Sequence, residues 1–174
     1  MGREVRMVPP GWEHPKNEKG YYIPLYKGPF SKRVARWDRE AELWKQGKRL
    51  KFDTDEVIPV EPEYLKYPYE EWDGPRPVKD DYMPEWPEGE ATMLVMYEDT
   101  TEGTTLSPGF ATPEDLARWL ADNGASAFGN ETATYDQWLA MIRQGSAPSA
   151  VMVVRPDGTG EIASGVSDAT RRAG

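Results

Sequence analysis

The sequence predicts an α+β fold, in which a small and largely antiparallel sheet packs against two or three helices and carries extended arms rich in proline and aromatic residues. The chain has 174 residues, about the size of one domain. Twelve of its 16 prolines lie before residue 90, and the segment after that point alternates apolar runs with amphipathic ones. We therefore expect an irregular region over residues 1–90, a compact core over residues 91–166 and a flexible tail over residues 167–174, joined in one structural unit.

One basic amphipathic helix is predicted in the proline-rich half, over residues 31–46. Ser31 is suited to cap its N-terminus, and Gly47 is suited to end it. The flanking segments, residues 9–30 and 57–90, place aromatic residues between prolines at irregular intervals, which favours extended and turn conformations. We expect these arms to wrap around the core. The apolar face of the helix consists of Val34, Trp37, Ala41 and Trp44.

The first element of the core is a strand over residues 92–98. Its sequence, Thr-Met-Leu-Val-Met-Tyr-Glu, is a nearly continuous apolar run with β-branched and aromatic members. Such a run is typical of a strand that is buried on both faces.

Two helices follow, over residues 112–123 and 134–144. In the first, Thr112 offers an N-cap hydroxyl and the proline after it suits the first helical position. In the second, Thr134 and the glutamine three residues later match a capping box. Each helix has one apolar face, and we expect its tryptophan to pack against the sheet. These tryptophans are Trp119 and Trp138.

The last element is a hairpin of residues 150–155 with residues 160–165, because residues 156–159 read Pro-Asp-Gly-Thr. Residues 151–154 are apolar at every position. We therefore expect this strand in the centre of the sheet, beside the strand at residues 92–98.

The net charge of −9 is unevenly distributed along the chain. Residues 1–52 carry 13 Lys and Arg against 6 Asp and Glu, residues 53–102 carry 3 against 16, and the remainder carries 5 against 8. Either the basic and acidic parts neutralise each other in the fold, or each faces its own partner. The charged N-terminal residues and the lack of a long apolar run indicate neither a signal peptide nor a membrane span.

The sequence favours no catalytic chemistry, and we expect no cofactor, no metal and no catalytic residue. There is no cysteine, which excludes disulfides and thiolate nucleophiles and fits a reducing cytoplasm. Phosphate-binding glycine loops and a G-x-S-x-G elbow are absent. His14 is the single histidine, and Pro15 prevents a helix from setting it against Glu18, so we expect it to make structural hydrogen bonds. The carboxylates after the 92–98 strand, Glu98, Asp99 and Glu102, would suit an acid and base pair or a hard-cation site.

The candidate binding site is the acidic stretch between residues 53 and 102, in which carboxylates alternate with aromatic side chains. Arrayed carboxylates resemble the phosphates of nucleic acid and would fit the basic groove of a nucleic-acid-binding protein, while aromatic side chains anchor interfaces. The competing interpretation is a solvated surface with its aromatic side chains packed inward. Direct nucleic-acid binding by the basic helix is not expected, because acidic residues share that helix and the whole chain is acidic. The predicted site comprises Tyr64, Tyr67, Tyr69, Glu70, Glu71, Trp72, Asp80, Asp81, Tyr82, Glu85 and Trp86.

Four segments resemble a family of small proteins encoded by bacteriophages and prophages of Gram-negative bacteria. They are residues 6–15 (RMVPPGWEHP), residues 82–86 (YMPEW), residues 101–104 (TEGT) followed by Ser107 and Pro108, and residues 112–129. The family has Ser where this chain has Thr101, a conservative departure. These motifs mark the family without defining an activity, and the resemblance implies a setting, the cytoplasm of an infected bacterium.

From these observations we expect a non-catalytic, phage-encoded binding protein that acts on a host or phage macromolecule. An anti-defence inhibitor that uses the acidic and aromatic surface fits this description, with a host or phage protein, such as a nucleic-acid-binding protein, as the partner and no membrane involved. The alternatives are a small carboxylate-dependent enzyme and a minor structural or packaging protein of the phage. The sequence leaves the oligomeric state open.

Overall fold

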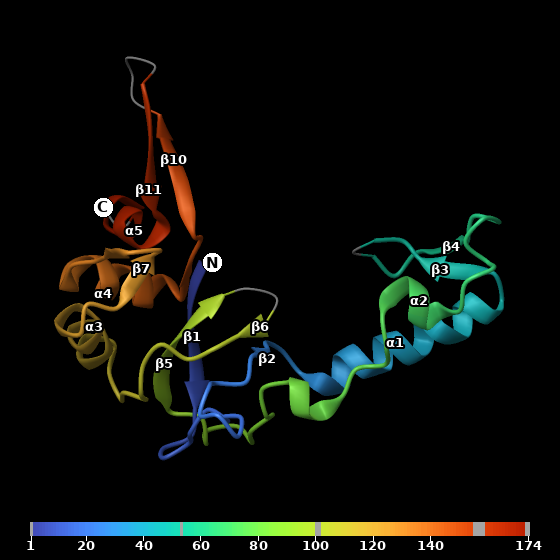
Figure 1. Ribbon diagram of the computed structural model, residues 1–174, viewed down its shortest axis with the longest axis horizontal. Coiled ribbons are helices and arrows are strands. Elements are labelled where there is room, and N and C mark those ends of the chain that lie inside the picture. Colours follow the sequence, from blue (N-terminus) through green and yellow to red (C-terminus); the bar gives the residue numbers. More distant parts are fainter. Residues whose placement is uncertain (1, 53, 100–101, 155–158, 173–174) are drawn as a thin grey trace. The chain divides into compact units, whose positions relative to one another are not determined.

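The computed structural model describes residues 2–52, 54–99, 102–154 and 159–172 (Figure 1). The chain forms two compact units, one from Met1–Tyr26 with Trp86–Gly174 and the other from Lys27–Glu85. Their helices and small antiparallel sheets give the predicted α+β fold. The boundary that we expected near residue 90 is wrong, because the first 26 residues belong with the C-terminal half and the inserted residues form their own unit.

The first unit is built on a three-stranded antiparallel sheet whose central strand comes from the N-terminus. Strand β1 (Gly2–Val8) lies between β5 (Met93–Asp99) and β9 (Ser146–Ala147). β1 and β5 pair along their full length, from Gly2 opposite Asp99 to Val8 opposite Met93. The strand predicted at residues 92–98 is thus confirmed as β5, whereas β1 replaces part of a region that we expected to be irregular.

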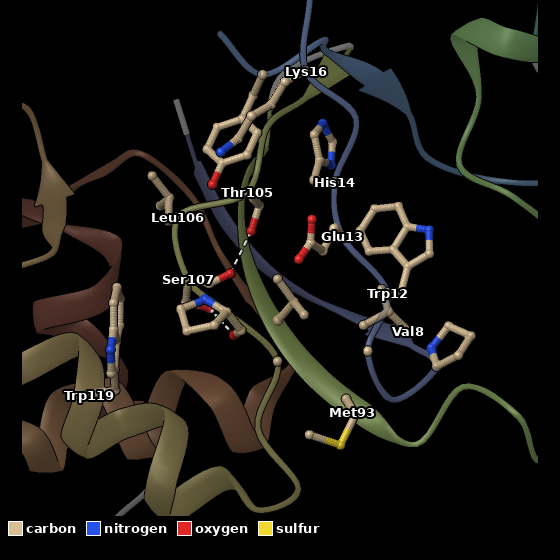
Figure 2. A pocket seen from close by; sticks show the side chains of 16 residues that line it. Val8, Trp12, Glu13, His14, Lys16, Met93, Thr105, Leu106, Ser107 and Trp119 are labelled. Carbon is tan, nitrogen blue, oxygen red and sulfur yellow. Dashed lines mark hydrogen bonds between the residues drawn. The ribbon is translucent and has the colours of Figure 1, made fainter. Parts of the chain in front are cut away.

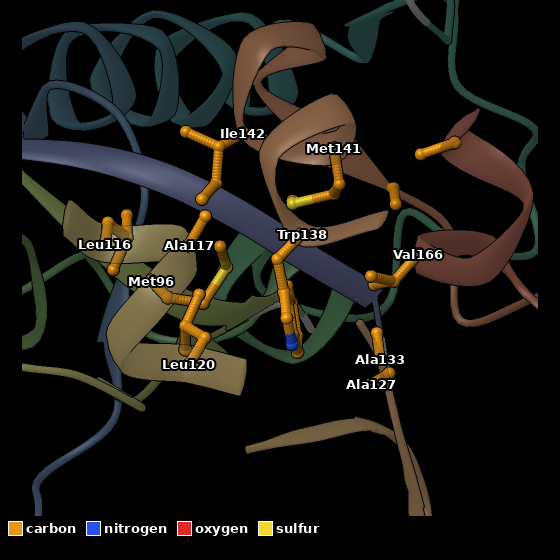
Figure 3. Packing of buried hydrophobic residues seen from close by; sticks show 12 residues of the cluster. Met96, Leu116, Ala117, Leu120, Ala127, Ala133, Trp138, Met141, Ile142 and Val166 are labelled. Atoms are coloured by element: carbon orange, nitrogen blue, oxygen red, sulfur yellow. The ribbon is translucent and has the colours of Figure 1, made fainter. Parts of the chain in front are cut away.

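Three helices pack on one face of this sheet (Figure 3). They are α3 (Pro113–Asp122), α4 (Tyr135–Gln144) and α5 (Gly165–Arg172). The buried side chains of the cluster are Met96, Leu116, Ala117, Leu120, Ala127, Ala133, Trp138, Met141, Ile142, Ala147, Val166 and Ala169, and Val5 and Leu94 of the sheet pack against them. The last helix contradicts the expected flexible tail at residues 167–172, because Val166 and Ala169 belong to the core, while residues 173–174 lie outside the described residues.

The predicted starts of α3 and α4 are confirmed. The Thr112 hydroxyl accepts a hydrogen bond from the backbone N–H of Asp115, at 3.1 Å. Thr134 and Gln137 form the complete capping box. Trp138 is fully buried as expected, but Trp119 is only half-buried and lies at the margin of the core.

Three two-stranded ladders complete the first unit. They are β2 (Leu25–Tyr26) with β6 (Glu102–Gly103), β7 (Ser126–Phe128) with β8 (Glu131–Thr132), and β10 (Ala150–Val154) with β11 (Gly160–Ser164). The hairpin of β10 and β11 was predicted, although residues 155–158 of its turn lie outside the described residues. Its expected place beside β5 is wrong, because among the described strands β10 pairs with β11 and not with β5. Met152 and Ile162, which face each other in this pair, are 71% and 69% exposed.

The second unit contains α1 (Phe30–Lys45), the ladder of β3 (Lys48–Leu50) with β4 (Val57–Pro59), α2 (Tyr69–Asp73) and a 3-10 turn (Lys79–Asp81). The helix predicted at residues 31–46 is confirmed as α1. Its predicted cap is wrong, because Ser31 lies inside the helix and its hydroxyl donates to Glu85 instead. Gly47 ends the helix with a positive φ of 71°.

An aromatic cluster holds the second unit together. Trp37, Trp44, Val60 and Tyr69 are its buried members. The indole N–H of Trp37 donates to the carbonyl of Gly74, and that of Trp44 donates to the carbonyl of Tyr67. Both buried indoles of the second unit therefore have an acceptor, which offsets the cost of burying a polar group. None of the helices in the described ranges combines the length and apolar composition needed to cross a bilayer.

Truncation of Trp138 to alanine is expected to destabilise the first unit by about 3–5 kcal/mol, because it empties a fully enclosed site in the core. The matched control is Ile162→Ala on the exposed hairpin face, which should change the free energy of unfolding by less than about 0.5 kcal/mol. Urea unfolding followed by circular dichroism measures both. Equal costs at the two positions would contradict the assigned core.

Candidate functional site

The candidate site is a pocket of about 570 Å³ in the first unit. Its floor is formed by Val8, Met93 and Val95, which the register of β1 and β5 places on the face opposite the helices. Its walls are the loop after β1, the segment 105–109 after β6, and Trp119 from α3. Figure 2 shows Trp12 and Trp119 on opposite sides of this space, with the side chain of Glu13 beside Trp12 and with Leu106 and Ser107 between Glu13 and Trp119.

His14 ties the loop after β1 to the sheet. Its Nε2 lies 2.6 Å from the carbonyl oxygen of Ile23, which accepts hydrogen bonds only, so Nε2 carries the proton. Its Nδ1 therefore accepts from the hydroxyl of Tyr97, at 2.9 Å. Burial lowers the pKa of His14, and the positive charge of Arg6 lowers it further while the bond to Ile23 opposes the shift. The expected structural role of His14 fits this neutral, doubly bonded ring.

Tyr97 is itself held by a buried polar stack. The guanidinium of Arg6 lies 4.4 Å from the centre of the Tyr97 ring and donates through Nε to Glu4, at 2.5 Å. Its Nη1 donates to the carbonyl of Leu25. Burial raises the pKa of Tyr97, so its hydroxyl keeps the proton that it gives to His14. A side chain at Gly103 would clash with Arg6, which explains the glycine in the TEGT segment.

Hydroxyl groups fix the opposite wall of the pocket. The hydroxyl of Ser107 accepts from the backbone N–H of Met96, at 3.0 Å, and donates to the carbonyl of Pro108, at 2.9 Å. Thr105 donates to the carbonyl of Ser107. These bonds, together with the backbone bond from Leu106 to Met96, hold segment 105–109 along the edge of β5. The hydroxyl protons of this wall are therefore used by the fold.

The pocket is equipped for binding more than for chemistry. The side chains of His14, Thr105 and Ser107 are hydrogen-bonded within the fold, and the charged side chains of the lining are Glu13 and Lys16. The ammonium of Lys16 lies 4.9 Å from the centre of the Tyr22 ring. In the described ranges no group of three or more His, Asp or Glu side chains is placed to hold a metal ion. Of the acids after the 92–98 strand, Glu98 accepts from Thr104, and the side chains of the other two lie outside the described residues.

The eleven residues of the predicted acidic and aromatic site are divided between the two units and differ in exposure. Ten lie in the second unit, and Trp86 lies in the first, edge-on to Trp12. Tyr69 is 6% exposed and belongs to the aromatic core. Tyr64 and Tyr82 are half-buried. The exposed members are Tyr67, Glu70, Glu71, Trp72, Asp80, Asp81 and Glu85.

Basic and acidic residues of the second unit neutralise each other. Residues 27–85 carry 12 Lys and Arg against 14 Asp and Glu, a net charge of −2, which leaves 9 against 16, or −7, for the first unit. Ion pairs join α1 to the acidic stretch, and the one between Arg76 and Asp38 uses two guanidinium nitrogens. The others include Arg33 with Asp73 and Arg39 with Asp55. Neutralisation within the fold, the first of our two interpretations, describes this unit.

Sequence reasoning missed the pocket because its walls are far apart in the chain. Trp12 and Trp119 are separated by more than a hundred residues. The resembling segments at residues 6–15 and 101–108 contain Trp12, Glu13 and Ser107, but their spacing alone does not bring them together. Comparison with protein-family models, curated proteins and solved structures gave no match. The resemblance to phage proteins therefore stays a prediction.

The stability of the first unit should fall as the pH drops below about 6.5, the ordinary pKa of histidine. Since the folded pKa of His14 is lowered, the unfolded chain binds the proton more readily, and the loss develops between these two pKa values. His14→Gln keeps a donor and an acceptor, so its urea midpoint should vary less between pH 7.5 and pH 5.5. Because His14 is the single histidine, the difference between the two chains isolates it. Parallel pH profiles would contradict the buried, neutral ring.

Proposed function

We propose that this chain is a non-catalytic, phage-encoded binding protein that acts on a host or phage macromolecule in an infected bacterium, and that it contacts its partner through the pocket of the first unit. The observation that carries the proposal is that some side chains of the pocket bond to the fold while others are left to contact a partner. The side chains of His14 and Ser107 are hydrogen-bonded to the fold, while Trp12 and Trp119 line the pocket.

The hydrogen bonds favour binding over catalysis. A histidine base needs a free ring nitrogen within reach of the substrate, but both nitrogens of His14 are engaged. A serine nucleophile needs a base beside it, whereas the proton of Ser107 goes to the carbonyl of Pro108. These side chains support the shape of the pocket.

The size and lining of the pocket suit an anchoring side chain of a partner. A volume of about 570 Å³ falls within the range of small-molecule and side-chain sites. Tryptophan is enriched among the residues that dominate interface energies. Because His14 and Ser107 hold both walls in place before binding, little ordering entropy remains to be lost when a partner arrives.

The phage setting enters this proposal through the resemblance of residues 6–15, 82–86 and 101–108. An inhibitor of a bacterial defence protein would work by this kind of stoichiometric binding. In contrast to the sequence-based hypothesis, the contact is moved from the acidic stretch to the pocket, because hydrogen bonds hold the pocket walls in place, whereas Asp73 and Asp55 of the acidic stretch already pair with arginines of α1.

The test is capture of a partner by the tagged chain in a Gram-negative bacterium, with three tryptophan variants compared. Trp12→Ala and Trp119→Ala each remove one wall of the pocket and should weaken capture of a stoichiometric partner by about 30-fold or more, as expected for an interface hot spot. Trp72→Ala, at an exposed tryptophan of the second unit, is the matched control and should capture normally.

Urea midpoints first establish that each variant is folded. Loss of capture in Trp72→Ala alone would return the binding site to the acidic and aromatic stretch. Absence of a stoichiometric partner for the parent chain would count against the binding function itself.

A further inference from the structure

We infer that the pocket of the first unit takes a positively charged side chain, lysine or arginine, from a protein partner, with Glu13 as its counter-charge and Trp12 and Trp119 as its walls. This inference rests on the proposed function and specifies the chemistry of the partner. It is carried by the position of one carboxylate, by the rings around it and by the charge of the unit.

Glu13 is the carboxylate of the pocket. Its side chain is exposed and points into the space between Trp12 and Ser107 (Figure 2). Within the described ranges no lysine or arginine forms an ion pair with it, although most other ion pairs of the chain lie on the surface. A carboxylate with a low-dielectric wall on each side attracts a cation more strongly than one that is fully solvated.

The rings of this site already accept cations from the chain itself. The ammonium of Lys16 lies over Tyr22 at 4.9 Å from the ring centre, at one end of the pocket. The ring of Tyr97, which bonds His14 but does not itself line the pocket, has the guanidinium of Arg6 at 4.4 Å from its centre. Trp12 and Trp119 line the pocket, and no Lys or Arg of the described residues lies over either ring. Indole rings bind cations better than phenol rings do.

The net charge of the first unit also favours a positively charged partner. With 16 Asp and Glu against 9 Lys and Arg, it attracts basic partners and repels acidic ones at long range. Lys16 is the single Lys or Arg among the lining residues, and its charge is stacked on Tyr22. Lys16 therefore competes with an incoming cation, so its removal should help binding.

Three capped peptides test the inference on the full chain. They are acetyl-Gly-Arg-Gly-amide, its norleucine analogue, which keeps an apolar stem without the charge, and its glutamate analogue. Binding is followed through the indole N–H signals of the seven tryptophans in two-dimensional NMR spectra, with the signals of Trp12 and Trp119 assigned from their alanine variants. The arginine peptide should shift these two signals, with an affinity at least several-fold above that of the other peptides.

Two charge variants sharpen the test. Glu13→Gln removes the counter-charge and keeps the shape, and should weaken binding of the arginine peptide by about tenfold, the loss expected for one charge-assisted contact. Lys16→Met removes the competing cation and should tighten binding about two- to fivefold. The effects have opposite signs, which a general loss of folding does not produce.

The outcomes that overturn the inference are distinct. Equal affinity for the arginine and norleucine peptides, with no effect of Glu13→Gln, would show an apolar pocket and leave the proposed binding function standing. Preference for the glutamate peptide would also overturn it. If no peptide shifts the signals of Trp12 or Trp119, the inference fails, and the partner-capture experiment decides on the proposed function independently.

Discussion

The pairing of β1 with β5 is the interaction on which the first unit depends. It joins residues 2–8 to residues 93–99, and the chain between them includes the whole second unit. Closing so long a connection costs entropy, but this cost grows only with the logarithm of the length. The pairing of β1 with β5 offsets this entropy cost through contacts on both faces of the sheet. Val5 packs against the helices, and Val8 lies on the floor of the pocket. One ladder therefore supports both the core and the site.

The pocket face of this ladder carries charges that are rare inside proteins. Glu4 and Arg6 lie two residues apart on β1, so they share a face and form a buried ion pair. Burying charges is expensive unless each is paired and hydrogen-bonded. Arg6 is paired with Glu4, donates to the carbonyl of Leu25 and lies over the ring of Tyr97, whose hydroxyl donates to His14. The buried Nη2 of Arg6 has no hydrogen-bond partner among the described residues. Through the other contacts of Arg6 and Tyr97 the wall of the pocket is fixed to the sheet.

Elements with local signals were predicted from the sequence, and those that depend on distant residues were not. The capping residues Thr112 and Thr134 identify their helices within a few positions, and the turn sequence after β10 identifies its hairpin. β1 was missed because its charges indicate exposure, whereas the fold pairs them in the interior. β10 was placed centrally because it is apolar throughout, yet an apolar run does not reveal which strand will pair with it. Residues 27–85 form their own unit because β1 pairs with β5, which follows them in the sequence, and local sequence patterns do not reveal this pairing.

The acidic stretch could be recognised from the local sequence, whereas the pocket depends on residues that are distant in the chain. The acidic stretch is conspicuous in the sequence, but Asp73 and Asp55 already neutralise Arg33 and Arg39 of α1. Each exposed ion pair of this kind contributes little to stability. Because an arginine already neutralises its carboxylate, the pair also attracts a charged partner only weakly. Glu13 is inconspicuous in the sequence, but the fold sets it among aromatic walls with no cation of the described chain paired to it. Affinity follows the position of a group, such as the exposed Glu13 carboxylate at the pocket, more than the number of charges in a segment.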